Sequence, residues 1–205
     1  MTPEYWQQAC RVLSRRDPVL RGLVKSYPGI AMQSRGDAFR TLARAIVGQQ
    51  ISVKAAETVW LRFVATVGAV RPISIQATTS QQLRAAGLSS RKVEYVQDLA
   101  RHFHDGLLDE AQWPASSDDE IIVDLMRVKG IGRWSAEMFL IFYLARPDVL
   151  PLDDIGLQRA IEMHYNEAGR LTRGEMQAIG NNWRPWSTVA TWYLWRSLGP
   201  AGAGN

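Results

Sequence analysis

The sequence is poor in the side chains that build disulfides and metal clusters. Cys10 is the only cysteine in 205 residues, and there are three histidines. A lone cysteine excludes an internal disulfide and any four-cysteine zinc or iron–sulfur site, and it indicates a reducing compartment. We therefore expect no iron–sulfur cluster in this protein.

Long apolar runs and long runs of one charge are also missing. No stretch approaches the roughly 18 apolar residues that a membrane span requires, and the first residues lack the pattern of a signal peptide. We therefore expect a cytoplasmic protein with no membrane partner. The net charge of +4 and pI of about 9.5 suit a polyanionic partner, but they are also common in proteins that bind no nucleic acid. Residues 199–205 are predicted to form a loose tail.

Clean pairs of alternating strands are absent, and helical periodicity dominates instead. Apolar residues recur at helical spacing in residues 39–47, 56–64, 93–103, 121–126, 136–144 and 155–164, and a tryptophan-rich segment follows at 187–195. A shorter helix that contains Leu83 and Ala86 is predicted to end at Gly87. The fold class predicted is all-α. With 46% hydrophobic residues the chain can form one catalytic unit, residues 1–205, of two helical lobes: about 35–147, and 1–34 with 148–205.

A glycine hairpin separates two of the predicted helices. Ser117 and Glu120 have the spacing of a capping box before the first helix, and Gly130 and Gly132 stand between it and the second. Amides exposed at such a turn, followed by a helix N-terminus, can bind a phosphate, and flanking cations would add to this. From Gly-x-Gly alone, an ordinary glycine-capped helical corner is the favoured reading.

A pair of carboxylates follows the second helix of this hairpin. Asp153 and Asp154 directly precede a predicted helix that contains Ile155, Leu157 and Ile161. Without further context, Asp154 is more simply interpreted as a helix N-cap than as a catalytic group.

Four segments in chain order together resemble the helix-hairpin-helix superfamily of DNA glycosylases, which includes endonuclease III and bacterial 3-methyladenine-DNA glycosylase II. They are the hairpin at residues 125–136, the segment AIVGQQIS at 45–52, the segment LRAAGLSSRK at 83–92, and the tryptophan-rich residues 183–195. The aspartate 20 residues after Trp134, flanked by LPLDD at 150–154, is similar to the alkylation-repair branch. The resemblance extends from about residue 39 to residue 196.

The resemblance implies a role for each candidate site residue. Asp154 is then the catalytic carboxylate, and Gln50 is the wedge that fills the gap left by a flipped nucleotide, although a polar helix end facing water is its plainer reading. Trp134 and Trp195 would stack on the extruded base, whose positive charge attracts aromatic faces by about 0.5–2 kcal/mol. Met138 and Ile155 complete the predicted base pocket at positions where longer relatives carry aromatic residues. The predicted phosphate contacts are Lys129, Gly130, Gly132, Arg133 and Ser135.

The same resemblance implies an activity. Bifunctional members carry a lysine where this chain has Trp134, so we expect hydrolysis to an abasic site without lyase activity. The expected substrate is double-stranded damaged DNA with alkylated bases of the 3-methyladenine and 7-methylguanine type, bound by a monomer at a cleft between the lobes and used in base excision repair at the bacterial nucleoid. No cofactor is required, although hairpin carbonyls can hold a monovalent cation. We expect this protein to lack the N-terminal lobe of the longer members.

The same residues are compatible with three other functions. A glycosylase for oxidised or mismatched bases would carry the lysine or other pocket residues. A non-catalytic DNA-binding or damage-sensing module would use the hairpin alone, yet a carboxylate such as Asp154 beside phosphates would oppose binding. An all-helical protein-interaction domain leaves the hairpin, the wedge segment and the tryptophan helix unexplained.

Overall fold

The structure is a computed structural model that describes residues 2–34, 36–166 and 170–199, and within these residues the chain forms twelve helices and no strand. The prediction of an all-α fold is therefore confirmed. Of the predicted tail, residues 200–205 lie outside the described residues. Over the described ranges, no helix is long and apolar enough to cross a membrane.

The chain divides into two compact units. One unit comprises residues 1–34 and 140–205, and the other comprises residues 35–139, so that the second boundary falls inside a helix. The lobes predicted from the sequence place this boundary a few residues later, at the proline-containing segment after that helix, and they remain a prediction. Each unit has its own buried core and is described separately.

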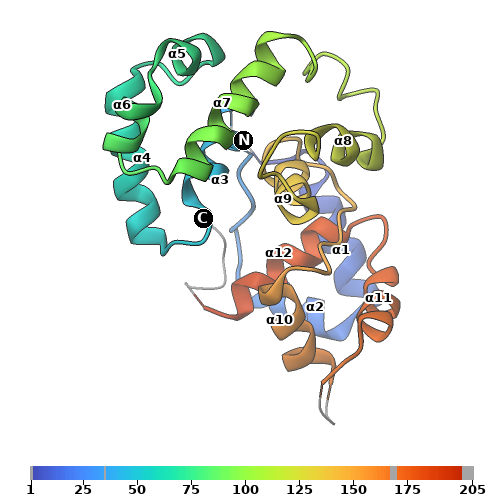
Figure 1. Ribbon diagram of the computed structural model, residues 1–205. Helices are drawn as coiled ribbons and strands as arrows, with labels where there is room; N and C mark the ends of the chain where they lie inside the picture. Colours follow the sequence, from blue (N-terminus) through green and yellow to red (C-terminus); the bar gives the residue numbers. More distant parts are fainter. Residues whose placement is uncertain (1, 35, 167–169, 200–205) are drawn as a thin grey trace. The chain divides into compact units, whose positions relative to one another are not determined.

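The unit of residues 35–139 is built around a long central helix. Its helices are α3 (Ala38–Gly48), α4 (Val53–Val67), α5 (Pro72–Ala77), α6 (Ser80–Ala85), α7 (Ser90–His104), α8 (Asp118–Leu125) and the first part of α9 (Arg133–Phe142) (Figure 1). Helix α7 packs against α3 and α5, and α3 packs against α4. The aromatic rings of Phe39, Phe103, Trp113 and Phe139 contact one another edge to face and join α3, α7 and α9. The capping box of Ser117 and Glu120 at the start of α8 is confirmed.

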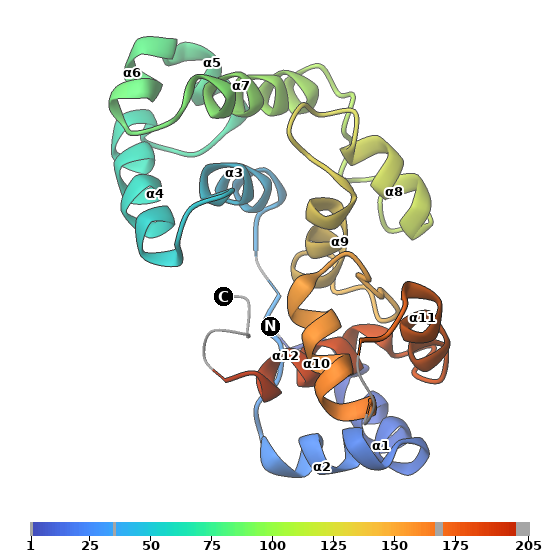
Figure 2. The ribbon, with the colours of Figure 1, turned by 60° about the horizontal axis from the view of Figure 1, so that its bottom comes forward.

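The other unit surrounds a buried helix near the C-terminus. Its helices are α1 (Trp6–Arg16), α2 (Pro18–Ser26), α10 (Ile155–Tyr165), α11 (Arg173–Asn181) and α12 (Ser187–Ser197), with the end of α9 (Figure 2). Residues 187–195 of α12 are all buried, and α12 packs against α1, α2 and α10. A helix that is buried on every face forms the centre of a core, which explains the many tryptophans there.

Four helices were not anticipated from the sequence, namely α1, α2, α5 and α11. The signal for α1 was present, because its buried residues Trp6, Ala9, Cys10 and Leu13 follow the helical period. Helix α9 also ends earlier than its apolar pattern indicates. Ala145 has a left-handed backbone with a φ of 51°, and Arg146 donates its N–H to the carbonyl of Leu140 at 2.9 Å, so that the chain turns out of the helix before Pro147 is reached.

Candidate functional site

Asp154 stands immediately before helix α10 and acts as its N-cap. Its Oδ1 accepts the backbone N–H of Leu157 at 2.6 Å and the indole N–H of Trp195 at 2.8 Å. The capping role considered from the sequence is therefore confirmed. It is compatible with catalysis, because two donors on one oxygen hold the half-buried carboxylate in a single orientation.

Trp195 is placed to orient this carboxylate. The side chain is 4% exposed, and its ring stacks on Phe142 with centroids 5.9 Å apart and an interplanar angle of 15°. The lack of a side chain at Gly156 leaves room for the hydrogen bond between Trp195 and Asp154. A Cβ at this position would lie 3.0 Å from Asp154 Oδ1 and 3.5 Å from Trp195 Nε1. The stacking of Trp195 on a flipped base stays a prediction. Ile155, also predicted for the pocket, is 63% exposed.

We expect Trp195→Phe to slow base release from methylated duplex DNA about 5- to 30-fold, because it removes one hydrogen bond to a carboxylate, about 1–2 kcal/mol, while retaining the ring on Phe142. Single-turnover rates measure this. Trp192→Phe is the matched control, because Trp192 is a buried tryptophan of the same helix that packs on Trp6 and Arg196. Equal slowing by both substitutions would contradict the orienting role.

The two glycines of the hairpin have different roles. Gly130 has a φ of 81°, and a Cβ at this position would overlap the ring of Tyr95, so both the turn and the packing on α7 require glycine. Gly132 is exposed, has no left-handed backbone, and has nothing within 4 Å of where its Cβ would lie. Its carbonyl accepts the N–H of Ala136, so α9 starts directly after this glycine. The predicted phosphate site therefore combines an open backbone with a helix N-terminus.

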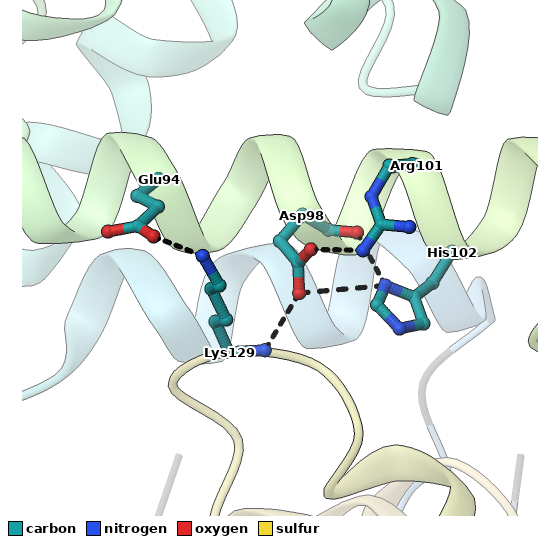
Figure 3. A network of polar contacts seen from close by, with 5 residues as sticks. All are labelled: Glu94, Asp98, Arg101, His102 and Lys129. Carbon is teal, nitrogen blue, oxygen red and sulfur yellow. Dashed lines mark hydrogen bonds and ion pairs between the residues drawn. The ribbon is translucent and has the colours of Figure 1, made fainter.

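A polar network holds the hairpin against α7 (Figure 3). Asp98 Oδ2 accepts the backbone N–H of Lys129 at 2.9 Å, and Oδ1 accepts a hydrogen bond from Arg101 at 2.7 Å. The Nδ1 atom of buried His102 lies 3.6 Å from Oδ2. Burial alone would raise the pKa of Asp98, but the hydrogen bonds and the charges of Arg101 and His102 outweigh it and hold this pKa below its ordinary value. The sequence did not point to Asp98, because it lies 31 residues from Lys129.

The two predicted phosphate-binding cations are already paired with carboxylates. Lys129 forms an ion pair with Glu94, which raises the pKa of the lysine (Figure 3). Arg133 forms two ion pairs: its Nη2 lies 3.4 Å from Asp119 Oδ1, and its Nε lies 3.2 Å from Glu137 Oε1. A phosphate would have to compete with these carboxylates, so Glu94 is a functional candidate that charge counting along the sequence did not identify.

We expect Glu94→Gln to strengthen binding of undamaged duplex DNA about threefold and to steepen the salt dependence by about 0.9 in log–log slope, because Lys129 can then neutralise one phosphate. Fluorescence anisotropy over a salt series measures both. Glu57→Gln is the control for net charge, since it removes the partner of Arg44 in an exposed ion pair of the same unit. A slope that is unchanged in Glu94→Gln, or that steepens equally in Glu57→Gln, would exclude the phosphate contact of Lys129.

The predicted wedge residue lies in the short loop between α3 and α4. Gln50 is exposed and has a φ of 58°, a left-handed conformation that costs a non-glycine residue of order 1 kcal/mol. Ser52 caps α4 through the N–H of Ala55 at 3.3 Å, and the amide of Gln49 reaches the hairpin carbonyl of Gly130 at 2.8 Å. The loop and the hairpin are therefore adjacent, as their shared role in DNA binding would require. The wedge role itself stays a prediction.

The remaining predicted residues are distributed over α9 and both units. Trp134 is 45% exposed in the first turn of α9, next to half-buried Ser135, and half-buried Met138 lies one turn further on the same face. These residues belong to one unit, whereas Asp154, Ile155 and Trp195 belong to the other. Each group is compact by itself, and their assembly into one base pocket stays a prediction.

No His, Cys, Asp or Glu cluster in the described ranges has the three members that a metal site would need. Two hairpin carbonyls already accept hydrogen bonds, that of Val128 from Ile131 and that of Gly130 from Gln49. Each carbonyl oxygen has a second lone pair, so the donor type fits a monovalent cation. The cation at the hairpin stays a prediction.

Comparison with known proteins agrees with this geometry. The family model of the HhH-GPD superfamily of base excision DNA repair proteins matches residues 43–185. DNA-3-methyladenine glycosylase 1 of Schizosaccharomyces pombe is 32% identical over 181 residues, which cover 85% of this chain and 78% of that protein. The structure is similar to that of the DNA-3-methyladenine glycosidase of Bacillus halodurans, with a TM-score of 0.84, 32% identity, and coverage of 94% of this chain and 90% of the other.

A second solved structure matches with similar coverage. The S. pombe 3-methyladenine DNA glycosylase Mag1, in complex with abasic DNA, has a TM-score of 0.80 and 30% identity, and the match covers 97% of this chain and all of that one. An all-helical chain with this hairpin and the following aspartate is of the helix-hairpin-helix class. The chain belongs to the HhH-GPD superfamily of base excision DNA repair proteins. It spans 65% of the length of two relatives from Bacillus subtilis.

Proposed function

We propose that this protein is a monofunctional DNA glycosylase that flips out alkylated bases of the 3-methyladenine and 7-methylguanine type and hydrolyses their glycosidic bond. Its partner is damaged double-stranded DNA, on which it acts as a monomer at the chromosome, and its product is an abasic site for base excision repair. The observation that carries the proposal is the carboxylate of Asp154, oriented by Leu157 and Trp195 in a chain of this superfamily. Relatives named as 3-methyladenine glycosylases support the substrate class.

The chemistry of the reaction suits a fixed carboxylate. Breaking a glycosidic bond develops positive charge on the sugar, and a preorganised anion stabilises that charge. In this proposal Asp154 supplies the anion and orients the attacking water. A cationic alkylated base is already a good leaving group, so that a strong general acid is less necessary.

Trp134 supports hydrolysis without strand cleavage. Lyase activity in this superfamily needs a lysine at this position to form a Schiff base with the sugar, and an indole cannot do so. In this proposal its 45% exposed ring contacts an extruded base together with Met138. The hairpin backbone at Gly130 and Gly132 would hold the phosphates on one side of the lesion, and Gln50 would fill the gap in the duplex.

The test is release of free bases from methylated duplex DNA, with strand breaks scored before and after alkali. The expected result is release of 3-methyladenine and 7-methylguanine, with breaks only after alkali. Breaks before alkali would overturn the monofunctional assignment. Binding of DNA without release of any base would favour the alternative, a non-catalytic DNA-binding or damage-sensing module.

A further inference from the structure

We propose that Gln49 is a positioning residue that locks the wedge loop, residues 48–52, to the hairpin, residues 128–132, so that the two segments enter DNA as one rigid device. The inference rests on the proposed function in one respect: it assumes that Gln50 in this loop fills the gap that a flipped nucleotide leaves in the duplex. The mechanical link itself depends only on contacts within the unit of residues 35–139.

The first contact joins the two segments directly. The Nε2 atom of half-buried Gln49 donates to the carbonyl of Gly130 at 2.8 Å, across 81 residues of sequence. The accepting glycine is the one whose left-handed backbone makes the hairpin turn. Gln50, with its own left-handed backbone, is the next residue after Gln49, so the anchor lies one peptide from the predicted wedge.

Helix α7 forms hydrogen bonds next to both segments. Lys92 donates its Nζ to the carbonyl of Val47 at 2.7 Å and thereby caps the last turn of α3, directly before the loop. Six residues further along α7, or about 1.7 turns, Asp98 accepts the N–H of Lys129 at 2.9 Å, directly before the hairpin glycine. The loop and the hairpin are thus each tied to α7 and also to each other, which closes a triangle of hydrogen bonds.

These three hydrogen bonds would fix the distance between the wedge loop and the hairpin, which base flipping requires. Phosphate binding by the hairpin is tolerant of small displacements, whereas filling the gap of a flipped nucleotide requires the wedge at a set distance from the bound backbone. Loss of the Gln49 contact should therefore impair gap filling and leave general DNA affinity nearly unchanged. An ordinary loss of fold stability would instead lower both together.

The experiment compares wild type with Gln49→Met, which keeps the side-chain length and removes the donor. The matched control is Gln97→Met, because half-buried Gln97 also donates a side-chain amide hydrogen bond, to Ser80 Oγ at 3.3 Å, elsewhere in the unit. Amide hydrogen exchange of residues 48–52 and 128–132 reports the link without DNA. Fluorescence of 2-aminopurine opposite an abasic-site analogue reports gap filling, and anisotropy reports affinity for undamaged duplex.

For Gln49→Met we expect faster exchange in both segments and a gap-filling equilibrium about tenfold weaker, with affinity for undamaged duplex changed less than threefold and no such changes in Gln97→Met. Unchanged exchange in residues 128–132 overturns the inference, and so does an equal loss of gap filling and of general affinity. If the wild type releases no base, the proposed function fails, and the exchange comparison still decides whether the two segments are locked together.

Discussion

Asp154→Asn is expected to reduce release of alkylated bases at least about 100-fold while leaving the fold intact. An asparagine side-chain oxygen caps a helix as well as aspartate does, so it can still accept the N–H groups of Leu157 and Trp195. The substitution therefore removes the negative charge and little else. A preorganised charge that stabilises a developing cation is worth a factor of this size or more.

Single-turnover release from methylated duplex DNA measures the effect, and circular dichroism melting establishes that the variant is folded. The neighbouring Asp153→Asn is the control, because Asp153 is paired with Arg173 at the surface and is not an N-cap. Release that persists at the wild-type rate in Asp154→Asn would eliminate Asp154 as the catalytic group. Loss of release in Asp153→Asn alone would move the assignment to the adjacent carboxylate.

Gly130→Ala is expected to destabilise the protein by about 3 kcal/mol and to abolish tight DNA binding, whereas Gly132→Ala should weaken DNA binding without loss of stability. At Gly130 an alanine meets both a φ of 81° and the ring of Tyr95, and strain and overpacking each cost about 1–3 kcal/mol. At Gly132 a Cβ meets no protein atom within 4 Å, so it obstructs only what approaches from solvent.

Thermal melting and anisotropy with undamaged duplex distinguish the two variants. For a chain of this length the melting temperature of Gly130→Ala should fall by about 6–12 °C, and that of Gly132→Ala by no more than about 2 °C. The affinity of Gly132→Ala for duplex DNA should drop about tenfold, because the methyl group keeps a phosphate from the amides at the start of α9. Normal DNA affinity in Gly132→Ala would refute the phosphate site at the hairpin.

The sequence was informative wherever a feature depends on residues that are close in the chain. The capping box before α8, the turn at Gly130 and the N-cap at Asp154 each arise within a few residues, and all were legible. The family resemblance rested on the same kind of local segment. Helix α1 was not predicted, although its buried residues follow the helical period.

Features that join distant segments were not legible from the sequence. Lys129 is predicted from the sequence to bind a phosphate, but in the structure it forms an ion pair with Glu94, with which a phosphate would have to compete. The family resemblance predicts that Trp195 stacks on the base, and its hydrogen bond to Asp154 across 41 residues gives it an orienting contact as well. Side-chain partners of this kind depend on which helix faces pack against each other. The spacing of apolar residues in the sequence indicates only which face of each helix is buried, and it does not identify the neighbouring helix.

The sequence by itself thus determined eight of the twelve helices that the structure describes, the hairpin turn, the position of the carboxylate and the lack of a lyase lysine, because backbone preferences and residue chemistry are local properties. Only the tertiary structure decided how those parts are held. The orientation of Asp154 by Trp195, the anchoring of the hairpin by Asp98 and the link of Gln49 to Gly130 each need two segments brought together by packing of the core. Hydrogen bonds require donor and acceptor within about 3 Å, and that proximity is a product of the whole fold.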